Sequence, residues 1–169
     1  MPVFGAVALV LAFTALLVRD GQAAINSTNT PPGETLVLLK SGETNLFSYG
    51  LYCLLSGARS GAAKPPGQDL ILVLRNSGAK NISLQFTEAN FTIKDATGNQ
   101  MKLALPNSPD GIGFGSVAVI DLKVLQGATA PEPWTFHLQR AQGQLPSLMA
   151  IDLLIEGVSP TSAAAKFRP

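Results

Sequence analysis

The residue types that could carry chemistry are few in this sequence and lie far apart. Cys53, Trp134 and His137 are each the single residue of their type among 169 residues. A serine hydrolase of the nucleophile-elbow type needs Gly-x-Ser-x-Gly on a strained turn, and that pattern does not occur. One His and one Cys also supply too few of the nitrogen and sulfur ligands that a transition-metal site usually takes. We therefore expect no enzyme activity, no catalytic residue, no cofactor and no metal.

The sequence around Cys53 and His137 favours structural roles for both. Cys53 is surrounded by leucines, so we expect a small buried side chain with no disulfide partner. His137 alternates with apolar residues and shares its phase with Thr135 and Gln139, which predicts a solvent-facing position on a strand. The remote alternative is a hydrolase in which separate Ser, Asp and His residues meet in space.

The longest polar interruption of the chain runs from 56 to 68 and contains two basic residues, Arg59 and Lys64. A segment of this composition must lie on the surface, so it is a candidate contact loop. In a protease inhibitor, Arg59 would enter a trypsin-like specificity pocket, which buries a carboxylate to select a cation. The alternative is a solvated loop between strands.

Two aromatic residues are the other candidates for binding. Phe114 lies among glycines in the connection 106–115, where we expect it to be partly exposed. This connection lacks the following helix that a phosphate-binding loop requires. Trp134 begins a strand and shares its phase with Phe136 and Leu138, which predicts a core position. A carbohydrate-stacking platform on Trp134 is the alternative.

The N-terminus predicts export. An apolar run from Val3 to Val18 is too short to span a bilayer comfortably, and Gly21 and Ala23 supply small residues for a signal peptidase. We expect residues 1–23 to be a signal peptide, cut after Ala23, and the protein to be secreted or to lie in the periplasm or cell envelope. A retained N-terminal anchor is the alternative, and residues 24–34 are expected to be a flexible segment.

Three Asn-x-Ser/Thr acceptors occur, at Asn26, Asn81 and Asn90. They are glycosylation sites if the source is eukaryotic and ordinary polar positions if it is bacterial. The expected strand phase points both Asn81 and Asn90 outward.

Charge excludes some partners. Twelve basic and 11 acidic residues give a net charge of +1, and only 14% of residues are charged. This balance gives no excess of basic residues that would bind nucleic acid or an anionic membrane surface. A protein partner, in an oligomeric state that the sequence leaves open, is the remaining expectation.

The pattern from residue 35 onward predicts an all-β domain at 35–157, followed by a disordered tail at 158–169. Apolar residues alternate with polar ones, and turn residues recur at intervals near ten. The run 70–74 is apolar in both phases, which indicates a central strand, and 95–99 has the composition of a hairpin turn. The expected strands are 35–40, 46–55, 70–76, 81–86, 90–95, 100–105, 116–124, 134–139 and 148–156.

A resemblance refines this prediction. The order GLYCLL, PPGQ, LILVLRNSGAKNISLQF and FTIKDATGNQ, from Gly50 to Gln100, resembles immunoglobulin-like modules of secreted and envelope proteins. Its motif residues are Asn76 and Gly78 in one corner and Phe91, Asp95 and Gly98 in a hairpin. The pattern is also similar to the bacterial intracellular proteinase inhibitor family, whose members are single β-sandwich domains. The resemblance implies an immunoglobulin-like antiparallel β-sandwich of about seven to nine strands.

Overall fold

The computed structural model of the protein describes residues 34–44, 47–56, 69–78, 80–83, 85–125, 130–140 and 151–165. Antiparallel strands make up most of this part of the chain, which confirms the all-β prediction. In chain order, the described elements are β1 (Glu34–Glu43), β2 (Phe47–Ser56), β3 (Asp69–Asn76), β4 (Ile82–Ser83), the 3-10 turn η1 (Glu88–Asn90), β5 (Phe91–Lys94), β6 (Leu103–Asn107), β7 (Gly111–Ile112), β8 (Val117–Val124), β9 (Trp134–Leu138), β10 (Leu153–Val158) and α2 (Pro160–Ala165).

A five-stranded sheet forms the larger layer, in the order β1-β2-β3-β8-β6. The run Leu70–Leu74 lies on β3, the central strand, and all five of its residues are buried. Leu70, Leu72 and Leu74 face the main core, while Ile71 and Val73 face the other way. The prediction of a central strand covered on both sides is confirmed.

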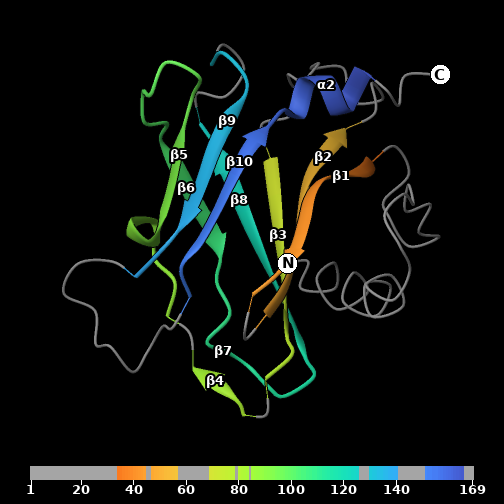
Figure 1. The fold of residues 1–169 in the computed structure, drawn as a ribbon, viewed down its shortest axis with the longest axis vertical. Coiled ribbons are helices and arrows are strands. Elements are labelled where there is room, and N and C mark those ends of the chain that lie inside the picture. The colour runs from red at the N-terminus through yellow and green to blue at the C-terminus, as the bar shows by residue number, and fades with distance from the viewer. Residues whose placement is uncertain are drawn as a thin grey trace, which may run out of the picture.

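A three-stranded sheet, in the order β10-β9-β5, forms the second layer. It lies in front of part of the larger sheet in Figure 1. Both sheets contribute to one main core, with Leu51 and Ile120 from the larger sheet and Ile93 and Phe136 from the smaller. The shared core explains why the strands of both sheets alternate in burial.

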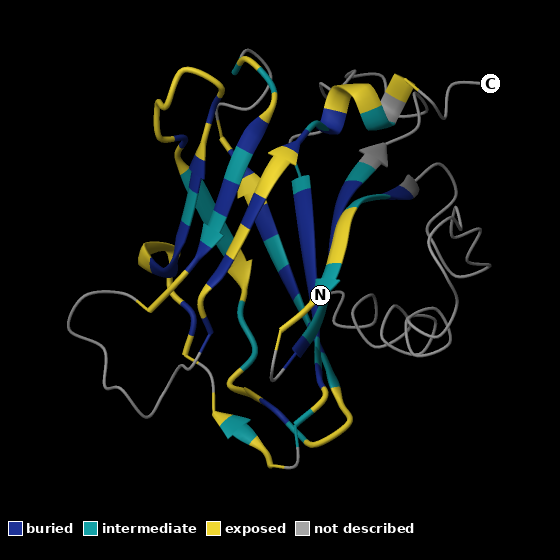
Figure 2. Ribbon diagram, viewed as in Figure 1, coloured by how far each residue is buried: buried dark blue, intermediate teal, exposed yellow. Residues whose placement is uncertain are grey.

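The alternation read from the sequence holds along the strands that the structure describes. On β9, Trp134, Phe136 and Leu138 are buried, whereas Thr135 and His137 are only half-buried. The same alternation runs along β5, β8 and the first residues of β10 (Figure 2). The amphipathic faces were therefore predictable from residue type alone.

Strand boundaries differ from the prediction where the chain changes sheet. The Asp95–Asn99 segment is a turn, as expected: Gly98 has φ of +87°, and the Asp95 carboxylate accepts from the Thr97 and Asn99 backbone N–H groups. The N–H of Met101 still donates to Ile93 of the small sheet, and the carbonyl of Lys102 already accepts from Leu125 beside the large one. The strand expected at 100–105 therefore begins only at Leu103.

The strand expected at 81–86 is also shorter than predicted. It is reduced to β4, because its partner β7 offers only Gly111 and Ile112 for pairing. Phe86, the last residue of this expected strand, is nevertheless buried in the main core. In the described part of the segment expected as a strand at 148–156, the strand is β10, which begins at Leu153 and continues to Val158.

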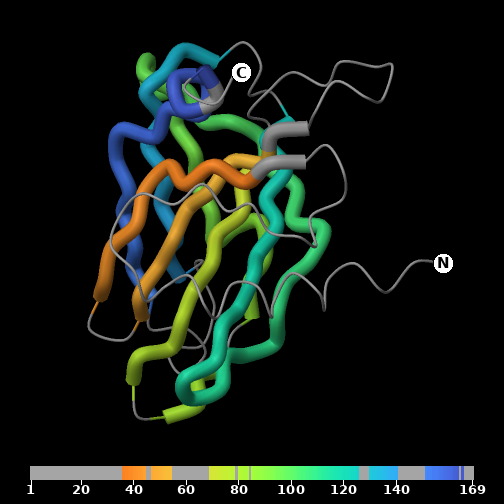
Figure 3. Tube along the Cα trace, turned by 90° about the vertical axis from the view of Figure 1, so that its right-hand side faces the viewer, coloured from red at the N-terminus to blue at the C-terminus, as the bar shows by residue number. Residues whose placement is uncertain are grey.

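A second apolar cluster covers the face of the five-stranded sheet that points away from the small sheet. We call it the outer cluster. All its members come from the larger sheet, whose strands β1, β2, β3 and β8 lie side by side in Figure 3. Its members are Leu36, Tyr52, Ile71 and Val73, with the partly buried Leu38, Leu54, Val117 and Val119. Tyr49 packs against the main core instead, so the two tyrosines of β2 face opposite sides.

The segment 158–169, expected to be a disordered tail, contains ordered structure. Val158 completes β10, and Pro160 begins the helix α2, where its missing N–H costs no hydrogen bond. Ala163 packs against the main core, and the N–H of Thr161 donates to Glu132 Oε1 at 2.9 Å. The small and polar composition misled the prediction because these contacts come from residues distant in sequence.

No helix within the described ranges is both long and apolar enough to cross a membrane. The predicted signal peptide at 1–23 and residues 24–33 of the predicted flexible segment lie outside the described residues, whereas the last residue of that segment, Glu34, begins β1.

Candidate functional site

The most exposed large apolar side chain in the described part of the chain is Phe114, at 67%. It lies between β7 and β8, at the end of the molecule where β4 pairs with β7 (Figure 1). The sequence predicted partial exposure here, and the structure confirms an exposed ring. An exposed aromatic side chain is a common anchor of protein interfaces.

A tight turn from Gly113 to Ser116 holds Phe114 outward. The N–H of Ser116 donates to the carbonyl of Gly113 at 3.0 Å, which closes the turn. Gly115 has φ of +69°, a backbone conformation that side chains other than glycine rarely adopt. Within the connection expected at 106–115, the chain therefore forms a hydrogen-bonded turn at this point. We call residues 113–116 the Phe114 turn.

Asn81 supports the Phe114 turn from the neighbouring chain segment. Its Oδ1 accepts a hydrogen bond from the backbone N–H of Phe114 at 2.8 Å. Asn81 itself is exposed and directly precedes β4. This contact fixes the backbone of Phe114 while leaving the ring free to meet another molecule.

Asn76 anchors the same end of the molecule from beneath. It is 1% exposed, and its Nδ2 donates to the carbonyls of Lys80 and Ile112 at 2.8 and 3.2 Å. Its Oδ1 accepts from the N–H of Gly78 at 2.9 Å, and its backbone N–H donates to the carbonyl of Ser116. One buried amide thus joins the end of β3, the loop before β4, and β7.

Sequence reasoning assigned no role at this site to Asn76 or Asn81. The signal in the sequence is the corner formed by Asn76 and Gly78, which by itself indicates a feature of the fold. An asparagine just before a turn bonds backbone groups that secondary structure leaves unpaired. That chemistry could have marked the corner as a support, but the contact with Phe114 depends on the tertiary fold.

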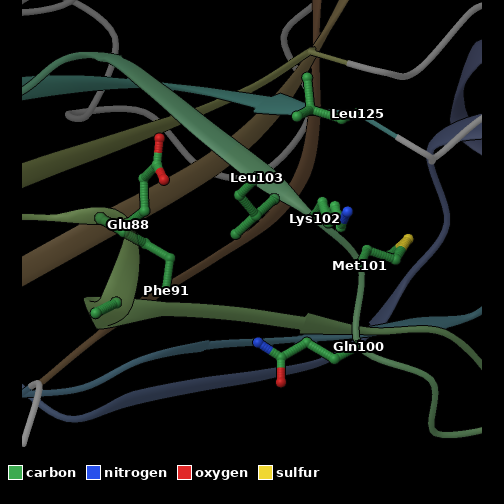
Figure 4. Close-up of a pocket in the computed structure, with 8 residues that line it drawn as sticks. Glu88, Phe91, Gln100, Met101, Lys102, Leu103 and Leu125 are labelled. Atoms are coloured by element: carbon green, nitrogen blue, oxygen red, sulfur yellow. The ribbon is translucent and has the colours of Figure 1, made fainter.

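A pocket of about 430 Å³ is a second candidate. It lies beside η1 and the start of β6, with Phe91, Met101, Leu103 and Leu125 among its lining residues. Figure 4 shows Glu88 and Lys102 on opposite sides of Leu103. The lining offers apolar contact and two charges of opposite sign, which suits binding of a small or extended ligand better than catalysis.

The remaining predicted binding residues lie elsewhere. Trp134 is only 2% exposed and belongs to the main core, so its ring offers no free face for a sugar. Its Nε1 donates to the carbonyl of Ala130 at 3.4 Å, so the N–H of the buried indole has a hydrogen-bond acceptor. Arg59 and Lys64 lie outside the described residues, as does the acceptor Asn26.

The prediction that Asn90 points outward is wrong. Asn90 is fully buried and lies in η1 rather than on a strand, so strand alternation does not apply to it. Its Oδ1 accepts from the N–H of Thr87 at 2.8 Å, and its Nδ2 donates to the carbonyl of Gln139 at 2.9 Å. These bonds occupy the amide that a glycan would need, whereas Asn81 is exposed as predicted.

Cys53 and His137 occupy structural positions. Cys53 is a free, buried cysteine, and burial is the main cause that raises the pKa of its thiol to about 11. His137 Nε2 lies 2.7 Å from Asp152 Oδ1 on the face of the small sheet that points away from the core. The prediction of a solvent-facing histidine holds in part, because His137 is half-buried. No group of three or more potential metal ligands occurs within the described ranges.

Comparison of the chain with protein-family models, with curated proteins and with solved structures gave no match.

Proposed function

We propose that this protein is an exported, non-enzymatic module that binds another protein through the Phe114 turn. The single observation that carries the proposal is a 67% exposed phenylalanine on a turn closed by hydrogen bonds. Because the backbone of this turn is already fixed, less conformational entropy of the loop is lost when a partner binds. An exposed aromatic on a rigid support therefore makes an efficient contact.

The proposed architecture is an immunoglobulin-like β-sandwich. Two antiparallel sheets that share one core support this proposal, and so does the corner of Asn76 and Gly78. In such an arrangement, loops at the ends of the sandwich carry binding, as the Phe114 turn would. Export rests on the apolar run Val3–Val18 and the small residues before the proposed cut after Ala23.

The test is an affinity pull-down with the protein as bait, from the secreted or envelope fraction of its own source. We expect one protein at near-stoichiometric yield with the wild type. The Phe114→Ala variant should weaken its binding roughly tenfold or more, as loss of an interface anchor does.

Leu154→Ala is the matched control. Leu154 is another exposed large apolar residue, but it lies on β10 of the small sheet, so binding should persist. Equal recovery of the partner by Phe114→Ala and wild type contradicts the proposal, as does reproducible recovery of no protein. If the partner is a protease, the Arg59→Ala variant decides whether the loop 56–68 takes part.

A further inference from the structure

The pocket of about 430 Å³ lies between the edge strands of the two sheets, β5 of the small sheet and β6 of the larger one. At the opposite edges of the sheets, α2 lies against β1, and its Ala163 packs against the main core. At β5 and β6 the chain crosses from one sheet to the other through Met101 and Lys102. The volume lies in the range of about 300 to 1,000 Å³ that small ligands occupy.

The pocket combines a closed apolar wall with an exposed apolar side chain. Phe91 and Met101 form the wall; both belong to the main core and are 3% and 5% exposed. Leu125 is 59% exposed, and it is one of three exposed large apolar residues in the described part of the chain. An apolar ligand group could therefore cover Leu125 without any change in the core.

Charges of opposite sign flank the apolar part of the pocket. Figure 4 shows Glu88 and Lys102 on opposite sides of Leu103. Both charged residues are exposed, and within the described ranges neither side chain forms an ion pair. A ligand with only a negative group would be repelled by Glu88, and a ligand with only a positive group by Lys102. The pocket therefore favours a ligand that carries both charges at separate positions.

The room beside β6 favours a compact ligand over an added strand. Cα atoms of η1 and β6 approach within 8 Å, whereas a strand inserted between them would need about 9.5 Å, twice the spacing of neighbouring strands. A free amino acid also fits poorly, because its two charges lie on one carbon atom and cannot reach both sides of Leu103. A peptide of two or three residues separates its terminal charges by roughly 7 to 10 Å.

We propose that this pocket binds short peptides of two or three residues that have both termini free and a large apolar side chain. The terminal ammonium lies beside Glu88, the terminal carboxylate lies beside Lys102, and the apolar side chain packs on Leu125. Gln100, which also lines the pocket, has an amide that can both donate to and accept from a peptide group.

This site is separate from the Phe114 turn. Phe114 precedes β8 and Leu125 follows it, and the eight residues of that strand span roughly 25 Å. Peptide binding therefore goes beyond the function proposed above and does not depend on it.

The test titrates the tripeptide Leu-Ala-Leu into the purified protein by isothermal titration calorimetry. We expect saturable binding at one site. Leu125→Ala should weaken it roughly fivefold, because the variant removes the exposed apolar contact. Leu154→Ala is the matched control, because it shortens an exposed leucine on β10 of the small sheet and should leave the affinity unchanged.

Capped peptides test the two charges separately. N-terminal acetylation of the peptide should weaken binding about threefold, the effect of an exposed ion pair, and Glu88→Gln should weaken binding of the free peptide equally. Glu88→Gln and wild type should bind the acetylated peptide alike, because the contact is already absent. C-terminal amidation and Lys102→Gln should form the same kind of pair. Glu156→Gln and Lys94→Gln, at exposed positions outside the pocket, are the charge controls.

Absence of saturable binding by the free tripeptide overturns the proposal. Equal affinities of the free, acetylated and amidated peptides also overturn it, and this comparison needs no variant, so it does not depend on how a variant folds. Unchanged affinity of a Leu125→Ala variant that is folded by circular dichroism is the third contrary result. Phe114→Ala should bind the tripeptide like wild type, so failure of this proposal is distinguishable from failure of the proposed function.

Discussion

The backbone N–H of Phe114 donates a hydrogen bond to Oδ1 of Asn81 at 2.8 Å, across 33 positions of sequence. This bond ties the most exposed apolar residue of the described chain to the segment before β4. Phe114 lies in a turn, outside the strand pairing that satisfies backbone groups elsewhere, and the Asn81 side chain supplies the acceptor for its N–H.

Replacing Asn81 tests whether the turn must be fixed for binding. Asn81→Ala removes the acceptor and should lower the free energy of unfolding by about 1 kcal/mol, measured by denaturant titration. It should also weaken capture of the partner although Phe114 is retained. Asn81→Asp keeps an oxygen acceptor at this position and should preserve binding. Wild-type binding by Asn81→Ala would show that the ring acts without this support.

Asn76→Ala should be more damaging than Asn81→Ala. It leaves the buried carbonyl of Ile112 and the N–H of Gly78 without their amide partner, so we expect a loss of about 2 kcal/mol in the free energy of unfolding. Asn107→Ala, at an exposed position of β6, is the matched control and should change stability little. If the two variants have equal free energies of unfolding, the hydrogen bonds of Asn76 do not stabilise this end of the molecule.

Cys53 should resist thiol reagents in the native protein. The thiolate is the reactive form, and a buried thiol with a pKa of about 11 is almost wholly protonated at pH 8. We expect reaction with a chromogenic disulfide only as fast as the protein unfolds, and rapid reaction in denaturant. Rapid modification of the folded protein, with unchanged circular dichroism, would contradict the buried position.

Asp121 should make stability fall as pH rises. Burial, followed by the nearby charge of Asp69, raises its folded-state pKa above 3.8, the ordinary value. The folded state therefore binds more protons than the unfolded state in the window above pH 3.8, and stability decreases as pH rises through it. Asp121→Asn should raise the free energy of unfolding at pH 7 and flatten this part of the pH profile.

The Asp121 measurement is a denaturant titration repeated across this pH range. Asp110→Asn, which removes a carboxylate from an exposed position, is the control for the change in net charge. An Asp121→Asn profile parallel to the wild-type profile would argue against a perturbed carboxyl group.

The sequence by itself determined the elements that depend on local pattern. Alternating residues on β8 and β9 marked their buried faces, and the doubly apolar run Leu70–Leu74 marked the central strand. The composition of 95–99 predicted its turn. Each of these features follows from side-chain chemistry and strand geometry over a few neighbouring residues.

Only the tertiary structure decided which polar residues became supports. Asn90 was predicted to face outward, yet it is buried because Gln139, 49 positions away, accepts from its amide. The support of Phe114 by Asn81 and the order of α2 likewise depend on contacts between distant segments. An amide can satisfy water or a buried backbone group equally well, so its environment is set by which segments the fold brings beside it.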